Sequence, residues 1–316
     1  MKQLFGVYAY NIPDRITHGI DGVELAQITE DRASYKGFPY AGQVNVLIAR
    51  QGVVHDMLDV FPNVKWLQLL NSGYEKLDLS VLKERNILFT NARSVYCSTI
   101  AEDVIAKILI LSRNYTRHFA DQQRCFWPDD DQLPNFNLDL EGKTLGILGA
   151  GAIGREIAIR AKVFGLKIHG YDPYLMEQEG FDVIYNRSGG LEQLLQESDY
   201  VITSLPVTEE TRDIINLQTL SMMKPSAYLI NVARGAIIRE EDLIEALNRG
   251  LIAGAYLDVA KKEPLPTDDP LWQAKNIHIT PHRAAYGDQM HRKMCALIER
   301  NIKHYMAGEP LEDQIL

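Results

Sequence analysis

The feature that most constrains this chain is a strand, a glycine-rich turn and a helix that follow one another from Thr144 to Phe164. The apolar strand pattern TLGIL leads directly into GAGAIG, and apolar residues at helical spacing follow. In a dinucleotide-binding unit the first glycine allows a tight turn, the second lets the backbone approach a pyrophosphate, and the third lets the helix pack near the strand. The helix N-terminus then offers free N–H groups to the phosphates. This context predicts a cofactor-binding turn made of Gly149, Gly151, Ala152, Ile153 and Gly154.

A carboxylate after the next strand bears on which dinucleotide binds. The strand predicted at Lys167–Tyr171 is followed by Asp172. This is roughly 20 residues after the first glycine, where an acidic residue accepts hydrogen bonds from the adenosine ribose. A 2′-phosphate would be repelled there and no arginine follows immediately, so NAD is favoured over NADP. The alternative is that Asp172 only caps the turn before Pro173.

Short apolar runs separated by helix-length segments extend over the whole chain and predict parallel α/β sheets. Further strands are predicted at Leu4–Ala9, Val44–Ala49, Trp66–Leu70, Ile87–Thr90, Tyr200–Thr203, Tyr228–Val232, Ala255–Val259 and Ile277–Thr280. Helices are predicted at Thr99–Phe119 (capped by Ser98 or Thr99), Ile153–Phe164, Leu191–Glu197, Glu240–Asn248 and Gly287–Met306, and a loop at Cys125–Leu140. At roughly 150 residues per domain, a chain of 316 residues favours two domains.

Charge and cysteine usage exclude several classes of protein. The formal charge of −9 argues against a nucleic-acid partner and gives no sign of attraction to an anionic membrane. Neither a signal peptide nor a long apolar run is recognised, so a soluble cytoplasmic protein is expected. The three cysteines are widely spaced and form no CxxC pair. Neither a disulfide scaffold nor a metal site is therefore expected.

Three residues with complementary chemistry each come shortly after a predicted strand: Arg234, Glu263 and His282. An imidazole can take or give a hydroxyl proton near neutral pH, and a neighbouring carboxylate fixes its tautomer. A guanidinium can grip a carboxylate with two hydrogen bonds and polarise the adjacent carbonyl. Together they suit hydride transfer to or from a secondary alcohol. Taken singly, they could be a turn arginine, a solvated carboxylate and an ordinary histidine.

From Leu47 to about residue 290 the chain resembles the D-isomer-specific 2-hydroxyacid dehydrogenases, in the phosphoglycerate-dehydrogenase-like and hydroxypyruvate/glyoxylate reductase-like branch. The resemblance rests on five ordered motifs: GKTLGILGAGAIG, SLPVTEETRDIIN, INVARGAIIREEDLIEAL, AYLDVAKKEPLP and TPH. It implies two Rossmann-like domains with parallel sheets and an active site in the cleft between them. Residues 1–97 and 285–316 would form a discontinuous substrate domain, and residues 98–284 an NAD-binding domain. It also implies a homodimer built through the cofactor domains.

The resemblance assigns a role to each candidate. The catalytic set is Arg234, Glu263 and His282. Besides the glycine turn and Asp172, the cofactor-binding residues are Thr99, Leu205, Pro206, Val232, Ala233 and Asp258, with Asp258 on the nicotinamide side. Backbone N–H groups near Ser72 and Gly73 are expected to hold the substrate carboxylate, with Tyr96 near the substrate pocket. Arg50 lies where some phosphoglycerate-specific members bind the phosphate.

The expected function is therefore that of an NAD-dependent 2-hydroxyacid dehydrogenase or 2-keto acid reductase, with phosphoglycerate dehydrogenase as a narrower alternative. Metal is not required, because Arg234 and backbone donors can polarise the carbonyl. An alternative of another class is a non-catalytic NAD-sensing binding protein, since some relatives are corepressors of similar fold. The acidic charge argues against it. Formate is disfavoured because Tyr96 stands where the formate enzymes carry asparagine.

Overall fold

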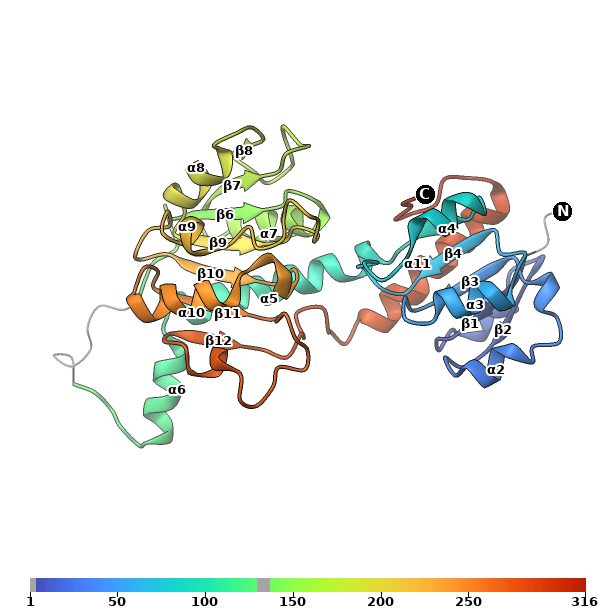
Figure 1. Cartoon of the computed structure of the whole chain (residues 1–316), viewed down its shortest axis with the longest axis horizontal. Coiled ribbons are helices and arrows are strands. Elements are labelled where there is room, and N and C mark those ends of the chain that lie inside the picture. The colour runs from blue at the N-terminus through green and yellow to red at the C-terminus, as the bar shows by residue number, and fades with distance from the viewer. Residues whose placement is uncertain (1–3, 130–136) are drawn as a thin grey trace. The chain divides into compact units, whose positions relative to one another are not determined.

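The computed structural model of the chain describes residues 4–129 and 137–316, which form two α/β units (Figure 1). The terminal unit combines the described residues up to Tyr96 with Gly287–Leu316, and the central unit runs from Cys97 to Tyr286. Helix α5 (Arg93–Ser112) begins in the terminal unit and continues in the central unit. Each unit has its own parallel sheet, so the predicted fold class is confirmed.

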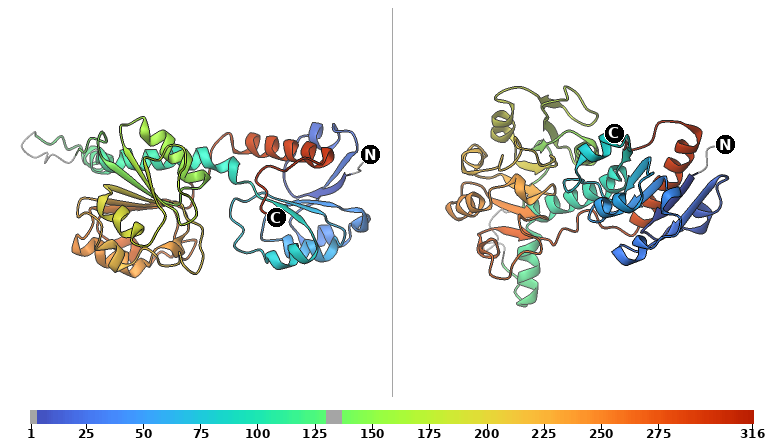
Figure 2. Two further views of the ribbon diagram at one scale, coloured as in Figure 1. Left: turned by 90° about the horizontal axis from the view of Figure 1, so that it is seen from above. Right: turned by 45° about the vertical axis from the view of Figure 1, so that its right-hand side comes forward.

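The terminal unit is built on a five-stranded sheet in the order β2-β1-β3-β4-β5. Successive side chains of a strand point to opposite faces. Leu47 of β3 therefore packs in the cluster that contains α3 (Val54–Val60), whereas Val46 and Ile48 pack with α11 (Met290–Ala307). The left panel of Figure 2 shows α11 on one face of this sheet and α3 and α4 on the other. The remaining elements are β1 Leu4–Tyr8, α1 Asp14–Thr17, β2 Val23–Gln27, α2 Arg32–Lys36, β3 Val46–Ala49, β4 Trp66–Leu69, α4 Leu79–Glu84 and β5 Leu88–Thr90.

The central unit contains a seven-stranded sheet in the order β12-β11-β10-β9-β6-β7-β8. Its strands are β6 Thr144–Leu148, β7 Lys167–Tyr171, β8 Val183–Tyr185, β9 Tyr200–Thr203, β10 Tyr228–Asn231, β11 Gly254–Leu257 and β12 Ile277–Ile279. Helices α8 (Gly190–Glu197), α9 (Leu217–Leu220) and α10 (Glu240–Arg249) pack on one face through a fully apolar core. Helices α5 and α7 (Ala152–Lys162) lie on the other face (Figure 2). Burial on both faces explains why the central strands β6, β9 and β10 read as nearly continuous apolar runs.

The predicted helix Thr99–Phe119 is wrong in its extent. Helix α5 begins at Arg93, so Ser98 and Thr99 lie inside it and cannot cap it. It ends at Ser112, and Asn114 then adopts a left-handed backbone conformation with φ of 52°. A right-handed helix cannot continue through such a residue. A separate helix, α6 (Tyr115–Gln123), therefore follows.

The structure contains two strands that the sequence pattern does not predict, β2 and β8. Both lie at a sheet edge and are partly exposed, so their apolar signal is weak. All the strands that the sequence predicts are found, with differences only at their ends. Part of the predicted loop Cys125–Leu140 falls on residues 130–136, outside the described residues, and its described flanks 126–129 and 137–140 contain no helix or strand. No helix in the described part of the chain has the length and apolar character needed to cross a membrane.

Candidate active site

Apart from Thr99 on α5, the candidate residues of the central unit lie at one edge of its sheet. All neighbouring strands pair in parallel, so their carboxyl ends share that edge. Strand β6 lies between β7 and β9, and the strand order runs away from β6 in both directions. Open α/β sheets bind ligands at such a reversal, just outside the carboxyl ends. The glycine turn follows β6 and therefore stands at this point.

Close contacts hold the glycine turn in shape. Gly149 has φ of 100°, which favours glycine, and its carbonyl oxygen accepts a hydrogen bond from the Ser204 hydroxyl at 2.8 Å. A Cβ on Gly154 would lie 2.1 Å from that same oxygen, so only glycine fits there. A Cβ on Gly151 would meet nothing within 4 Å. This open space lies at the start of α7, where helix N–H groups bind phosphates, so the residues present fit a dinucleotide.

The carboxylate of Asp172 lies against the glycine turn. Its Oδ2 accepts a hydrogen bond from the Ala150 N–H at 3.1 Å, and its Oδ1 accepts one from the Tyr174 N–H at 3.0 Å. Asp172 thus borders the glycine turn and also caps the turn that contains Pro173. The capping contact is therefore present, and the hydrogen bond to the adenosine ribose stays a prediction.

Glu263 and His282 are brought together from different loops. Glu263 follows β11 and His282 follows β12, and Oε2 of Glu263 lies 2.7 Å from Nδ1 of His282. The other carboxylate oxygen accepts a hydrogen bond from the Ala260 N–H at 3.1 Å. The His282 side chain is 46% exposed, so a small molecule can reach it. A carboxylate that accepts from Nδ1 leaves Nε2 as the ring nitrogen for a ligand.

A buried amide holds the turn that carries Arg234. Asn231, at the end of β10, donates from Nδ2 to the Arg234 carbonyl at 3.0 Å. Its Oδ1 accepts from the Ala233 N–H at 3.0 Å and from the Thr203 hydroxyl at 2.6 Å. Every polar atom of this side chain is thus used within the protein, as burial requires. The half-buried Arg234 side chain donates to the Ala233 carbonyl at 2.7 Å.

Gly235 brings the Arg234 turn directly against the loop that carries Glu263. A Cβ on Gly235 would lie 2.0 Å from the carbonyl carbon of Ala260 and 2.2 Å from the nitrogen of Lys261. Backbone meets backbone here, so no side chain fits between the loops that follow β10 and β11. The structure thereby packs the Arg234 turn beside the Glu263 loop, in addition to the side-chain contact of Glu263 with His282.

Asp258 lies beneath the turn that carries His282. Its side chain is 1% exposed, and it accepts hydrogen bonds from the Thr280 hydroxyl (2.6 Å) and from the N–H groups of Arg283 (3.0 Å) and Ala284 (2.8 Å). Its backbone carbonyl accepts from the His282 N–H at 2.8 Å. The structure thus shows that Asp258 holds this turn through hydrogen bonds. The contact of Asp258 with the cofactor, which the sequence suggests, stays a prediction.

The remaining cofactor candidates also belong to the central unit. Leu205 and Pro206 follow β9, and Val232 and Ala233 follow β10. Leu205, Val232 and Ala233 are each only 7% exposed. They can therefore border a ligand mainly through their backbone. Thr99 lies on α5 and is partly exposed.

The substrate candidates lie in the terminal unit. Ser72 and Gly73 follow β4, and the Ser72 carbonyl accepts a hydrogen bond from Nδ2 of Asn91 at 2.7 Å. The Tyr96 hydroxyl donates to the Leu70 carbonyl at 2.6 Å. In this structure both contacts hold the loop after β4, which offers its backbone N–H groups at the carboxyl edge of the sheet.

Arg50 follows β3 at the same edge of the terminal sheet. Its Nε lies 3.7 Å from Oε1 of Glu30, and both side chains are largely exposed. A phosphate at this arginine would meet the carboxylate of Glu30 nearby.

Several residues that support the site are missing from the prediction made from sequence. Asn231 and Thr203 hold the Arg234 turn, and Thr280 and Lys107 contact Asp258. One signal was present for Lys107, which interrupts the apolar run IAKILIL of a helix. No comparable sign in the sequence pointed to the roles of Thr203, Asn231 and Thr280. Asparagine and threonine are ordinary residues at the end of a short strand.

Comparison with known proteins gives consistent similarities. Residues 105–284 match the family model described as D-isomer specific 2-hydroxyacid dehydrogenase, NAD binding domain. The chain is 32% identical over 273 residues to a D-3-phosphoglycerate dehydrogenase of Methanocaldococcus jannaschii, covering 86% of this chain but only 51% of that protein. It is 33% identical over 257 residues to a glyoxylate reductase of Korarchaeum cryptofilum, covering 80% of this chain and 76% of that one.

A solved structure is similar over nearly the whole chain. It is an NADPH-dependent glyoxylate/hydroxypyruvate reductase from Sinorhizobium meliloti, determined in complex with citrate, with a TM-score of 0.80 and 26% identity. The similarity covers 99% of this chain and 98% of that chain.

We expect Gly235→Ala to disturb the turn that carries Arg234. Backbone atoms of Ala260 and Lys261 must move to admit the added methyl group, and such overpacking costs about 1–3 kcal/mol of stability. Hydrogen–deuterium exchange should become faster in residues 231–237 and 258–263. Gly52→Ala is the control, because a Cβ there meets nothing within 4 Å. Unchanged exchange in both segments of Gly235→Ala would contradict the packing described.

Proposed function

The chain belongs to the D-isomer-specific 2-hydroxyacid dehydrogenase family, and on this premise we propose that it transfers a hydride between a nicotinamide and C2 of a small 2-hydroxy or 2-keto acid. The observation that carries the proposal is the 2.7 Å contact between His282 and Glu263 at the carboxyl edge of the central sheet. When bound, NAD(H) supplies the hydride acceptor or donor. The chain supplies binding, orientation and proton transfer.

His282 is the proposed acid and base. During reduction of a keto acid, Nε2 gives a proton to the C2 oxygen as negative charge develops there, and during oxidation it takes the hydroxyl proton. Glu263 accepts from Nδ1, which fixes the ring orientation and leaves Nε2 for the substrate. Proton transfer by a positioned side chain contributes about 10²–10⁴-fold to a rate.

Arg234 is the proposed carboxylate clamp. Its guanidinium can bind a planar carboxylate with two hydrogen bonds and polarise the adjacent C2 carbonyl. Backbone N–H groups near Ser72 and Gly73 would hold the same carboxylate, and Tyr96 would border the pocket. Support comes from the position of each group after the carboxyl end of a strand in its own unit.

An unphosphorylated acid is the proposed substrate class, such as glyoxylate or hydroxypyruvate. The relatives include a glyoxylate reductase and a D-3-phosphoglycerate dehydrogenase, and the chain spans about half the length of the latter. Arg50 lies 3.7 Å from Glu30, so a substrate phosphate would compete with a carboxylate for this arginine. That pairing favours an acid without phosphate.

We expect the protein to oxidise NADH when glyoxylate or hydroxypyruvate is present, as followed by NADH absorbance. His282→Ala should lower kcat by about 10²–10⁴-fold, and Glu263→Gln should lower it less because the imidazole remains. Arg234→Ala should chiefly raise KM, since the carboxylate loses its clamp. His118→Ala is the control, because this histidine is exposed on α6. NADH binding without turnover of any 2-keto acid would instead support the NAD-sensing protein.

We propose that NAD(H) is preferred over NADP(H). The reductase from S. meliloti is NADPH-dependent, so family membership does not decide the question. The preference rests on Asp172, whose carboxylate borders the glycine turn and would repel a 2′-phosphate.

We expect kcat/KM with NADH to exceed that with NADPH by about a hundredfold or more, as a like-charge contact costs several kcal/mol. Asp172→Ser should reduce the ratio by weakening NADH binding and admitting NADPH. Glu177→Gln removes one charge from the exposed segment that follows and should leave the ratio unchanged. Equal rates with both cofactors in the wild type would refute the role proposed for Asp172.

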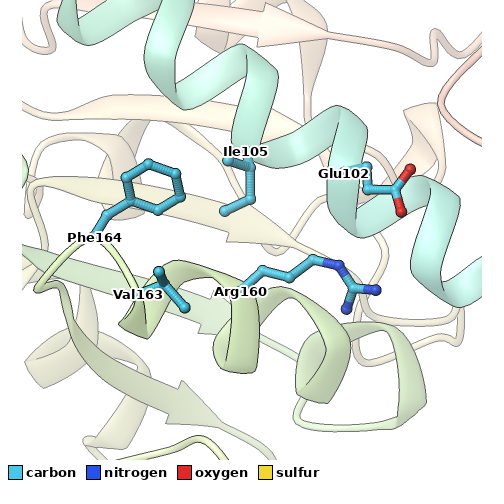
Figure 3. Close-up of a pocket in the computed structure, with 5 residues that line it drawn as sticks. All are labelled: Glu102, Ile105, Arg160, Val163 and Phe164. Atoms are coloured by element: carbon cyan, nitrogen blue, oxygen red, sulfur yellow. The ribbon is translucent and has the colours of Figure 1, made fainter.

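We propose that two copies associate through the central unit. An apolar groove lies between α5 and α7, lined by Ile105, Val163 and Phe164 with Glu102 and Arg160 at its rim (Figure 3). Val163 is 84% exposed. Further apolar side chains are exposed on and after α6: Tyr115, Phe119, Phe126 and Trp127. Exposed apolar surface of this kind marks an interaction site.

We expect a dimer by size-exclusion chromatography with light scattering. Val163→Glu should shift the protein toward monomer, because the charge would be buried without a partner. Val183→Glu places the same charge at an exposed valine of β8 and should leave the mass unchanged. A monomeric wild type would end this part of the proposal.

A further inference from the structure

Lys107 is a buried lysine with no role in the chemistry described so far. It lies on α5 within an apolar run, and its side chain is only 2% exposed. An ammonium group is costly to bury unless opposite charges surround it. The contacts of this side chain therefore indicate what the lysine does.

Two carboxylates and an aromatic ring surround the Lys107 ammonium. Asp103, one helical turn earlier on α5, accepts a hydrogen bond from Nζ. Oδ1 of Asp258 lies 3.9 Å from Nζ, and the centroid of the Tyr256 ring lies 5.0 Å away. Asp258 is itself 1% exposed. Lys107 is thus the cation beside a fully buried carboxylate.

Asp258 uses that carboxylate to hold the backbone that carries His282. Oδ1 and Oδ2 accept from the N–H groups of Arg283 and Ala284, and the Asp258 carbonyl accepts from the His282 N–H. Three successive N–H groups therefore point at one residue. An ionised carboxylate holds such donors more strongly than a neutral carboxyl group.

His282 needs this support because of its backbone conformation. Its φ is 55°, in the left-handed region that is unfavourable for a residue with a Cβ. Such a conformation persists where the surrounding structure imposes it. The hydrogen bonds to Asp258 impose it, and they direct the ring toward Glu263.

We propose that Lys107 is a positioning residue for His282: its buried ammonium group fixes the Asp258 carboxylate in place, and Asp258 holds the turn that places the imidazole. The catalytic meaning of this inference rests on the proposed function, in which His282 is the acid and base. The placement of the turn does not depend on that function.

The other titratable groups around the pair are few in the described structure. Burial raises the pKa of Asp103, against the opposing effect of Lys107. Burial also raises the pKa of Tyr256 on β11 and lowers that of His278 on β12, whose ring packs against Tyr256. Arg283, His282 and Glu263 lie on the loops above. Lys107 is therefore the cation nearest to Asp258 on the α5 side.

The test is the hydrogen bond from the Ala284 N–H to Asp258 in Lys107→Met, read from the amide proton of Ala284. Protein labelled with ¹⁵N-alanine gives this resonance, and its position and its rate of exchange with solvent report on the hydrogen bond to the carboxylate. In Lys107→Met the resonance should move upfield and exchange faster, because the carboxylate loses the cation that fixes it. A resonance position and an exchange rate equal to those of the wild type would overturn the proposal.

Two further variants complete the design. Lys303→Met removes an exposed lysine that pairs with Glu299 one turn away, and should leave the Ala284 resonance unchanged. If Lys107→Met does not fold, Asp103→Asn with Lys107→Met removes the buried pair as a unit and still leaves Asp258 without a cation. The same change of the Ala284 resonance is expected there, and its absence would equally overturn the proposal.

Activity gives the second readout. In Lys107→Met, kcat for keto acid reduction should fall by about tenfold to a hundredfold, as expected when a catalytic group is misplaced by about 1 Å. KM for the keto acid should stay unchanged, because the Arg234 turn does not depend on Lys107. A purely structural loss would lower the fraction of active protein while leaving kcat per active site unchanged, and would contradict the proposal. A wild type that reduces no 2-keto acid would refute the proposed function, while the amide resonance would still decide the role of Lys107.

Discussion

All seven strands of the central sheet run in the same direction, so every loop that leaves a carboxyl end starts from one edge. This constraint brings the glycine turn, Asp172, the Arg234 turn and the pair Glu263–His282 to the same side of the unit. The residues are far apart in sequence, and no local interaction could collect them. The sheet provides the common edge, and the loops then need only short-range contacts to fix each side chain.

Those short-range contacts are mostly buried polar interactions. Asn231 holds the Arg234 turn, and Asp258 holds the His282 turn, each with nearly all of its hydrogen-bonding capacity used. Buried polar groups add little net stability, but a fully satisfied set fixes one geometry. A catalytic group needs such fixing, because a displacement of about 1 Å can cost two orders of magnitude in rate. The loops above the sheet edge are therefore held by hydrogen bonds where the proposed chemistry occurs.

The sequence predicts parallel sheets without a strand order, and it predicts that Arg234, Glu263 and His282 each come shortly after a strand, as they do in the structure. Strand ends followed by Arg234, Glu263 and His282 could be recognised because parallel strands share an edge. The break between α5 and α6 at Asn114 could not be recognised, because it depends on one left-handed residue within an apolar helical pattern. The contacts of Lys107 with Asp258 were equally hidden, since they join a helix to a strand more than a hundred residues later. Edge strands β2 and β8 were missed because half-exposed strands lack a strong apolar pattern.

The central claim is that His282, supported by Glu263, acts on an acid whose carboxylate is bound by Arg234. A crystal structure with NADH and oxamate, an unreactive analogue of a 2-keto acid, tests it most directly. We predict that Nε2 of His282 lies about 3 Å from the oxygen that mimics the C2 carbonyl, with the Arg234 guanidinium on the carboxylate. An analogue bound elsewhere, or an imidazole turned away from it while still paired with Glu263, would contradict the claim.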